Sequence, residues 1–445
     1  MKRTTVEEIL LSSMKAAAGQ LPDRAAIEGY QFERLRQTIA HAAAKSPFYR
    51  DRLAGVRPAD ITDHGSLSRL PFTSEDDLRR RGQQMLCVSQ DEVARIITMQ
   101  SSGTTGPPKR LFFSEEDLER TLVFFHHGMR TLVRPGQKVL ILLPGATPDS
   151  TGDLLARGLA RMEVASRIYG LVADPQQAAE EVFAEGYDAV VGFPVQVLAL
   201  SRTPAGQSVP AGRIKSVLLC SDYIPRTVCD EVSAAWRCRV FSHYGTVESG
   251  LGGGVECEAL SGCHLREADL LFEVVCPRTG VALPPGQWGE LVFSTLSRRA
   301  MPLIRYRTGD RARLLAGPCR CGSQLARLDK VRGRISQVRQ LANGQTLSLA
   351  LLDELLFAIP GVLDFQAVLD RDKDGERLTV RLTTLPAERD QALQQAALQL
   401  KELARLRDLQ IGVAANPGGL INRGKRIIED NRGKISHETA YQAAL

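Results

Sequence analysis

The most informative segment of the chain reads SSGTTGPPK and runs from Ser101 to Lys109. It places four hydroxyl side chains, two glycines and a lysine within nine residues. The glycines let backbone amides turn inward, the hydroxyls donate hydrogen bonds and the lysine adds positive charge, which together favour binding of a polyphosphate. A surface turn is the alternative, because Ser, Thr and Gly are common in turns. The candidate phosphate-binding residues are Ser101, Ser102, Gly103, Thr104, Thr105, Gly106 and Lys109.

The residues that flank this loop distinguish it from a Walker A loop. Residues 95–99 and 111–113 are both strand-like, whereas a Walker A loop has the pattern G-x-x-x-x-G-K-[ST] and leads into a helix. A helix is predicted only from Ser114, which three acidic residues follow in the manner of a helix cap. The sequence therefore predicts a phosphate loop between two strands.

Composition places the chain among ordinary globular proteins. Its 445 residues are 43% hydrophobic and 24% charged, which predicts two or three domain-sized units. The net charge of +6 is too thin an excess for a nucleic-acid-binding surface, so we expect no nucleic-acid partner. The absence of a long apolar run or a secretion signal predicts no membrane association. Nine cysteines in such a chain predict reduced thiols and a cytoplasmic location.

Alternating strands and helices follow the loop. After a helix at 31–44 near the N-terminus, we predict strands at 138–143, 189–191 and 214–219, helices at 174–185 and 225–236, and a β-rich region at 273–314. This order indicates a largely parallel α/β sheet.

The pattern of predicted helices and strands changes near residue 335. Beyond it we predict helices at 348–358 and 388–406 and strands at 362–370 and 377–383. The predicted fold class is therefore α/β, with two domains. The large N-terminal domain, residues 1–335, combines parallel sheets and helices with a β-rich subdomain, and the small mobile C-terminal domain, residues 336–445, is α+β.

Several ordered motifs resemble the adenylate-forming superfamily of acyl-CoA synthetases, most closely its phenylacetate–CoA ligase branch. They include the loop at 101–109, HYGTVE at 243–248, PLIRYRTGD at 302–310 and GKRII at 424–428, with N-terminal matches at 32–49 and 70–73. The resemblance covers almost the whole chain. It implies an enzyme with an adenylate-forming N-terminal domain that joins a carboxylate to AMP with loss of pyrophosphate. The acyl group then passes to coenzyme A.

The resemblance also assigns roles to individual residues. Glu248 would bind Mg²⁺, which takes one or two carboxylates together with phosphate oxygens. Tyr244 would stack on adenine, and Gly245 would let the backbone approach the acyl group. Asp310 would accept hydrogen bonds from both ribose hydroxyls, and Arg334 would contact the nucleotide. The implied cofactors are ATP, Mg²⁺ and coenzyme A, and the implied substrate is a small carboxylic acid, most closely an aryl or arylalkyl one.

The chain departs from the family pattern in three places. Val247 stands where the branch has Thr or Ser, so a phosphate-binding hydroxyl comes from Thr246 or is missing. Cys220-Ser221-Asp222 replaces a Gly-Gly-Glu or Gly-Ala-Glu stretch, and Ser336 and Gln337 replace the acids at the hinge. We include Ser221, Asp222, Thr246 and His243, the neighbour of Tyr244, among the expected ATP-binding residues.

Two Gly-Lys pairs compete for the role of the family's catalytic lysine. They contain Lys425 and Lys434. We favour Lys425, because the residues that follow it resemble the family ending. This lysine would hold the carboxylate and stabilise charge that develops on the α-phosphate.

Four residues have the chemistry of a structural zinc site. Cys257, His264, Cys319 and Cys321 make a Cys₃His set, and some members of the branch show a similar pattern. Cys263 is a rival ligand, and unligated buried thiols or redox chemistry are the alternatives.

Some of the function remains open at this level. Residues 145–169, where the family binds its acid, differ from the usual text, so the acid can differ from phenylacetate. Transfer to an amine or a carrier protein, and a catalytically silent nucleotide-binding homologue, are the alternative functions. A homodimer is one option for the assembly.

Overall fold

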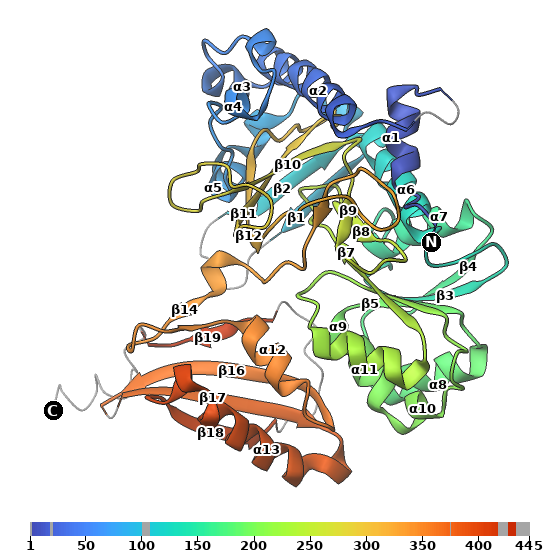
Figure 1. Cartoon of the computed structure of the whole chain (residues 1–445), viewed down its shortest axis with the longest axis vertical. Coiled ribbons are helices and arrows are strands. Elements are labelled where there is room, and N and C mark those ends of the chain that lie inside the picture. The colour runs from blue at the N-terminus through green and yellow to red at the C-terminus, as the bar shows by residue number, and fades with distance from the viewer. Residues whose placement is uncertain (1, 18–20, 100–106, 374, 417–425, 433–445) are drawn as a thin grey trace.

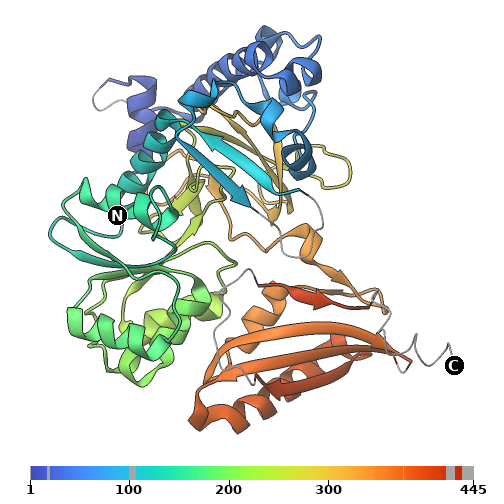
Figure 2. The same cartoon turned by 180° about the vertical axis from the view of Figure 1, so that it is seen from behind.

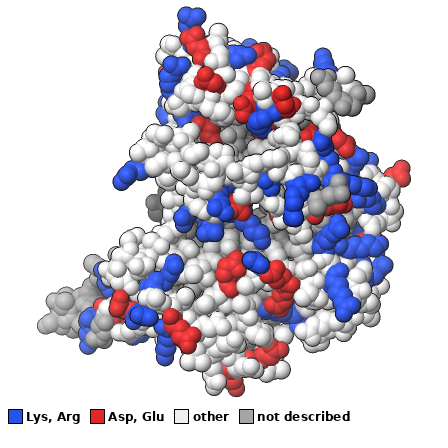
Figure 3. All heavy atoms as spheres, viewed as in Figure 1, with Lys and Arg blue, Asp and Glu red and all other residues white. Residues whose placement is uncertain are grey.

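The computed structural model describes residues 2–17, 21–99, 107–373, 375–416 and 426–432. The chain forms a large upper part, which runs from the N-terminal helices through the strands before Arg339, and a smaller lower part, which begins near Arg339 and is drawn in orange and red (Figure 1). Acidic and basic side chains are interspersed over both parts on the face shown in Figure 3. None of the helices within the described ranges is long and apolar enough to cross a membrane.

An eight-stranded sheet has the order β13-β9-β8-β7-β6-β5-β3-β4. The five strands from β7 to β4 run parallel, and β8, β9 and β13 extend the sheet antiparallel. The strands are β3 (Lys138–Leu142), β4 (Ala165–Ile168), β5 (Ala189–Gly192), β6 (Ser216–Leu219), β7 (Arg239–Tyr244), β8 (Gly254–Glu256), β9 (Cys263–Leu265) and β13 (Arg327–Leu328). Helix α6 (Glu115–Met129) precedes the first of these strands, and the helices between them are α7 (Thr151–Ala160), α8 (Pro175–Glu185), α9 (Pro194–Arg202), α10 (Pro204–Ser208) and α11 (Arg226–Trp236).

Two smaller antiparallel sheets complete the upper part. One pairs β1 (Arg95–Met99) with β2 (Lys109–Phe113), and the other is a meander of β10 (Leu270–Val275), β11 (Gly289–Thr295) and β12 (Tyr306–Ala312). The N-terminal helices are α1 (Glu7–Met14), α2 (Arg24–Lys45), α3 (Pro47–Arg52), α4 (His64–Leu67) and α5 (Glu75–Arg81). Short 3₁₀ helices span Pro58–Asp60, Gly82–Met85, Gln90–Glu92, Ile335–Gln337, Pro386–Glu388 and Ala404–Leu406.

The lower part is built on a four-stranded sheet of order β18-β17-β16-β19 (Figure 2). Its central strands β16 and β17 form an antiparallel hairpin, and each edge strand runs parallel to its neighbour. The elements are β14 (Arg339–Gln340), β15 (Thr346–Leu347), α12 (Leu349–Leu356), β16 (Val362–Asp372), β17 (Gly375–Thr384), α13 (Arg389–Glu402), β18 (Gln410–Ala415) and β19 (Ile428–Asp430).

Buried apolar side chains connect the two parts. One continuous cluster contains Val197 and Leu198 of α9, Trp236 of α11, and Leu356 and Phe365 of the lower part. Because removal of apolar surface from water stabilises this contact, the lower part is packed against the α9–α11 face of the large sheet.

The predicted α/β fold class is confirmed, while several boundaries differ. The predicted helix at 388–406 ends at Glu402, because Leu403 adopts an extended backbone with ψ of 112°. The predicted strand at 214–219 begins at Ser216. The helix at 31–44 begins earlier, at Arg24, where the Asp23 side chain accepts a hydrogen bond from the amide of Ala26. The domain boundary at 335 stays a prediction.

Candidate functional site

Lys109 enters the site from the end of the predicted phosphate loop. It is the first residue of β2 and pairs with Met99 of β1, so a strand indeed stands on each side of the loop. Its Nζ forms an ion pair with the Glu248 carboxylate, and both side chains are buried. Burial alone would raise the pKa of Glu248, but the charge and hydrogen bond of Lys109, together with the charge of Arg334, lower the pKa below its ordinary value.

Two further residues, which were not assigned to the site from the sequence, contact the members of this ion pair. The Tyr306 hydroxyl donates a 3.0 Å hydrogen bond to Oε1 of Glu248. Glu75, in the first turn of α5, lies 3.4 Å from Nζ of Lys109. The Ser74 cap of this helix fixes the position of Glu75. Burial opposes ionisation of Glu75, yet Lys109, Arg79 and Arg334 lower its pKa.

Tyr244, Asp310 and Arg334 form a second group that joins the first through Glu75. The Tyr244 hydroxyl donates a 2.9 Å hydrogen bond to Oδ2 of Asp310, and Nε of Arg334 lies 3.5 Å from Oδ1 of the same carboxylate. Another nitrogen of Arg334 lies 3.6 Å from Glu75. Burial disfavours the charge of Arg334, but the surrounding acids, Asp310 first among them, raise its pKa. Segments far apart in the sequence therefore meet at one polar site.

The loop after β7 is shaped by close packing at Gly245. A Cβ atom there would lie 2.4 Å from the carbonyl oxygen of Leu251, so only glycine fits. The Thr246 hydroxyl accepts a 3.2 Å hydrogen bond from the Ser249 amide and thus stabilises the turn. Val247 packs against the main hydrophobic core. Val247 therefore provides no hydroxyl at the position expected to bind phosphate, and the hydroxyl of the neighbouring Thr246 is engaged in the turn.

His243 and the loop after β6 lie at the edges of the site. His243 contacts the rings of Phe124 and Phe125, and burial lowers its pKa to about 4, so its imidazole is neutral at pH 7. Ser221 has a left-handed φ of 71° and faces the sulfur of Cys220, while Asp222 accepts a 2.8 Å hydrogen bond from the Tyr223 amide. Parallel pairing of β6 with β7 puts this loop at the same sheet edge as Tyr244.

Several predicted residues lie outside the described residues. They are Ser101, Ser102, Gly103, Thr104, Thr105 and Gly106 of the loop, and the competing lysines Lys425 and Lys434.

The four predicted zinc ligands lie together in a separate cluster. The ligand atoms of Cys257, His264, Cys319 and Cys321 are all within 4.8 Å of one another, and all four residues are buried. Sγ of Cys257 is 3.7 Å from Sγ of Cys319, and Sγ of Cys321 is 3.4 Å from Nε2 of His264. Thiolates about 2.3 Å from a tetrahedral Zn²⁺ stand about 3.8 Å apart, so the donor set fits this ion. Cys263 points instead toward the carbonyl of Ser242, which removes it as a rival ligand.

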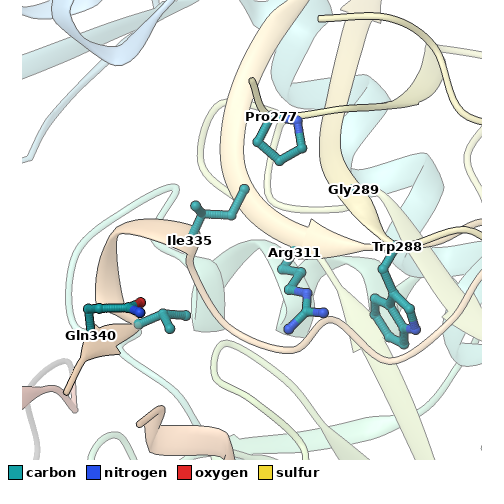
Figure 4. A pocket seen from close by; sticks show the side chains of 7 residues that line it. Pro277, Trp288, Gly289, Arg311, Ile335 and Gln340 are labelled. Atoms are coloured by element: carbon teal, nitrogen blue, oxygen red, sulfur yellow. The ribbon is translucent and has the colours of Figure 1, made fainter. Parts of the chain in front are cut away.

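A pocket of about 360 Å³ lies on the other side of β12 (Figure 4). Asp310 faces the polar site, and Arg311, the next residue along the strand, lines this pocket together with Trp288 and Ile335. The Arg332 guanidinium lies 4.3 Å from the Trp288 ring centroid. None of the predicted nucleotide-binding residues in the described part of the chain lines this pocket.

Comparison with known proteins identifies the family. None of the models of known protein families matches the chain. A phenylacetate–coenzyme A ligase of Thermus thermophilus is 31% identical over 78% of this chain and 79% of its own length. The chain belongs to the phenylacetate–coenzyme A ligase family. Another such ligase, from Pseudomonas putida, is 32% identical over 69% of this chain and 71% of its own length.

Solved structures share the fold of this phenylacetate–coenzyme A ligase family member. A 2-hydroxyisobutyryl-CoA ligase in its postadenylation state, in complex with 2-HIB-AMP, gives a TM-score of 0.80 at 18% identity, over 96% of this chain and 94% of that chain. The same ligase in its thioesterification state gives 0.64 at 19% identity, over 96% and 97%. The predicted family is thus confirmed, and with it the reaction class, AMP-forming activation of a carboxylic acid followed by thioester formation with coenzyme A.

Proposed function

We propose that this ligase converts an aryl or arylalkyl carboxylic acid into its acyl-adenylate and then into its coenzyme A thioester. The observation that carries the proposal is the meeting of Lys109, Glu248, Asp310 and Arg334 at one polar site. A ligand with phosphates, a ribose and a metal ion needs both cations and carboxylates, and this site offers both. Family membership supplies the expected order of the two half-reactions.

We assign the nucleotide contacts residue by residue. The loop at 101–106 and Lys109 would bind the phosphates, and Lys109 would exchange its bond with Glu248 for phosphate oxygens. Tyr244 would lie against adenine, Asp310 would accept the ribose hydroxyls, and Arg334 would neutralise nearby phosphate charge. The hydrogen bond from Tyr244 and the proximity of Arg334 already hold the Asp310 carboxylate in place for this role.

Glu248 is the proposed carboxylate ligand of Mg²⁺. Tyr306 and Lys109 both contact its Oε1, so Oε2 is the oxygen that we assign to the metal. Its lowered pKa keeps this carboxylate ionised at neutral pH, as a hard divalent cation requires. Bound Mg²⁺ would share the negative charge of the phosphates.

The Cys₃His cluster is the proposed site of a structural Zn²⁺. Cys257 follows β8, His264 belongs to β9, and Cys319 and Cys321 lie between β12 and β13. Zinc bound by these four side chains would tie the segments together and would take no part in catalysis, because four protein ligands leave no open position.

The remaining assignments concern the whole chain. We propose a domain boundary at residue 335, with the catalytic Lys425 on the smaller domain. None of the nine cysteines, all of which lie in the described residues, takes part in a disulfide, which supports a cytoplasmic location. A homodimer stays a proposal for the assembly.

One experiment tests the reaction and its substrate. ATP–pyrophosphate exchange would be measured over a panel of aryl, arylalkyl and short aliphatic acids. We expect exchange that depends on an aryl or arylalkyl acid, and AMP release that rises on addition of coenzyme A. Exchange without any effect of coenzyme A would point to an amine or carrier protein as acceptor. Silence over the whole panel would favour a nucleotide-binding homologue without catalysis.

A further inference from the structure

Glu354 of α12 reaches from the lower part of the chain to the upper part. Its carboxylate accepts hydrogen bonds from the Tyr223 hydroxyl at 2.7 Å, from the Arg226 amide at 2.8 Å and from the Thr227 amide at 3.2 Å. Figures 1 and 2 show α12 at the side of the lower sheet that faces α9 and α11. One side chain therefore makes three bonds across the contact between the two parts.

These hydrogen bonds provide acceptors for backbone amides at the N-terminus of helix α11. Arg226 and Thr227 are its first two residues, and the amides of a first helical turn have no partner within the helix. Pro225 stands at the N-cap and provides no side-chain hydrogen bond. Glu354 supplies the missing acceptor, and its negative charge also suits the positive end of the helix dipole.

Asp353, the residue before Glu354 in α12, connects this helix to Arg426 near the end of the chain. Asp353 accepts a 2.7 Å hydrogen bond from Arg426, which directly follows the proposed catalytic Lys425. Arg426 is buried, and Asp364 lies 3.3 Å from its Nε. Tyr223, the partner of Glu354, directly follows Ser221 and Asp222 of the proposed nucleotide site. Helix α12 thus carries adjacent acids, one that holds the C-terminal segment and one that holds the nucleotide-site loop.

The arrangement of the two parts of the chain is more similar to the postadenylation state than to the thioesterification state of a solved CoA ligase. The chain superimposes on the 2-hydroxyisobutyryl-CoA ligase with a TM-score of 0.80 in the postadenylation state and 0.64 in the thioesterification state. The bonds of Glu354 are therefore observed in an arrangement that is closer to the former.

We propose that Glu354 is a positioning residue for the first half-reaction. It docks α12, together with the Arg426 that Asp353 binds, on the start of α11 during adenylation, and releases them for thioester formation. The inference rests on the proposed function, because it needs two half-reactions. Arg202 is a second anchor, since it donates a 2.6 Å hydrogen bond to the carbonyl of Phe357, so loss of Glu354 weakens the docking without abolishing it.

The test measures the half-reactions separately in the full chain. Glu354→Ala should slow carboxylate-dependent ATP–pyrophosphate exchange about 10- to 100-fold, the scale of a charge-assisted hydrogen bond. Thioester formation from premade acyl-adenylate should change less than about twofold, because this step does not use the contact. Glu354→Gln keeps one oxygen acceptor and should fall between wild type and Glu354→Ala. Asp230→Ala removes an exposed acid from the same helix α11 and is the matched control, with both rates expected to stay at wild-type values.

A second readout does not depend on activity. Amide hydrogen exchange at Arg226 and Thr227 should become at least about 10-fold faster in Glu354→Ala and stay unchanged in Asp230→Ala. Unchanged exchange in Glu354→Ala, or an equal slowing of both half-reactions, overturns the inference. If wild type shows no carboxylate-dependent exchange of pyrophosphate, the proposed function fails, while faster amide exchange in the variant would still establish the docking contact.

Discussion

The phenol of Tyr244 donates a 2.9 Å hydrogen bond to the carboxylate of Asp310, across the gap between the eight-stranded sheet and the three-stranded meander. Tyr244 ends β7, and Asp310 lies in β12. Burial and the nearby carboxylate raise the pKa of Tyr244 well above its ordinary value, so the phenol stays protonated and remains a donor. The bond therefore orients the acid that we assign to the ribose.

Asp310→Asn should raise the KM for ATP about 10- to 100-fold, because an amide provides only one acceptor oxygen and no charge for the ribose hydroxyls. The KM for the carboxylic acid should change little, since the acid does not contact the ribose. Steady-state kinetics with each substrate varied in turn would measure both constants. An equal increase in the two would show that the change acts through the fold of the site.

Lys109→Met should destabilise the protein by about 3–5 kcal/mol, because it leaves Glu248 buried without its partner. The double variant Lys109→Met/Glu248→Gln should regain part of this loss, since a neutral amide is less costly to bury. Urea unfolding would give the free energies. Arg80→Met, which breaks an exposed ion pair with Asp76, is the control and should cost at most about 1 kcal/mol. A double variant as unstable as Lys109→Met would contradict the pairing.

The same variant should change how stability depends on pH. In wild type the pKa of Glu248 is lowered below 4.5, so this residue adds stability above pH 4.5 that is lost as pH falls through the folded-state pKa. Without Lys109, burial instead raises the pKa, and ionisation of Glu248 then costs stability as the pH rises. The difference in unfolding free energy between wild type and Lys109→Met should therefore grow from pH 4 to pH 7. A difference that is constant with pH would exclude Glu248 as its source.

Lys425→Ala should slow adenylation about 10²- to 10³-fold, the usual effect of removing one electrostatic contact from a transition state. Thioester formation from premade acyl-adenylate should be nearly unaffected. Pyrophosphate exchange and single-turnover thioester formation would separate the two steps. Lys434→Ala is the matched variant and should retain adenylation. The opposite result, with loss only in Lys434→Ala, would reverse the assignment.

The sequence was sufficient for the fold class and for the residues that motifs carry. Lys109, Glu248 and Asp310 belong to recognisable motifs, and the structure brings them and Arg334 to one site. Glu75 could not be found in this way. In the sequence it reads as a helix-capping acid, and its contact with Lys109 exists only because α5 packs beside β2.

The position of Tyr306 in the site could have been predicted from its spacing to Asp310. It stands four residues before Asp310 in one strand, and side chains at even spacing share a face of a strand. The same alternation distinguishes Cys263 from His264, which point to opposite sides of β9. The ends of the strands and of α13 were less predictable, because they depend on the backbone conformation of single residues. Leu403, for example, is extended and ends α13.

Purified protein should contain about one zinc ion per chain, because four buried donors stand at tetrahedral spacing. Cys319→Ala should lose the metal and lower the Tm, and a strong chelator should lower the Tm of wild type toward that of the variant. Elemental analysis and thermal unfolding would measure both effects. Cys263→Ala is the matched control: its thiol points toward the Ser242 carbonyl, so this variant should keep its zinc. Protein purified without zinc, or equal metal loss in the two variants, would contradict the assignment of these ligands.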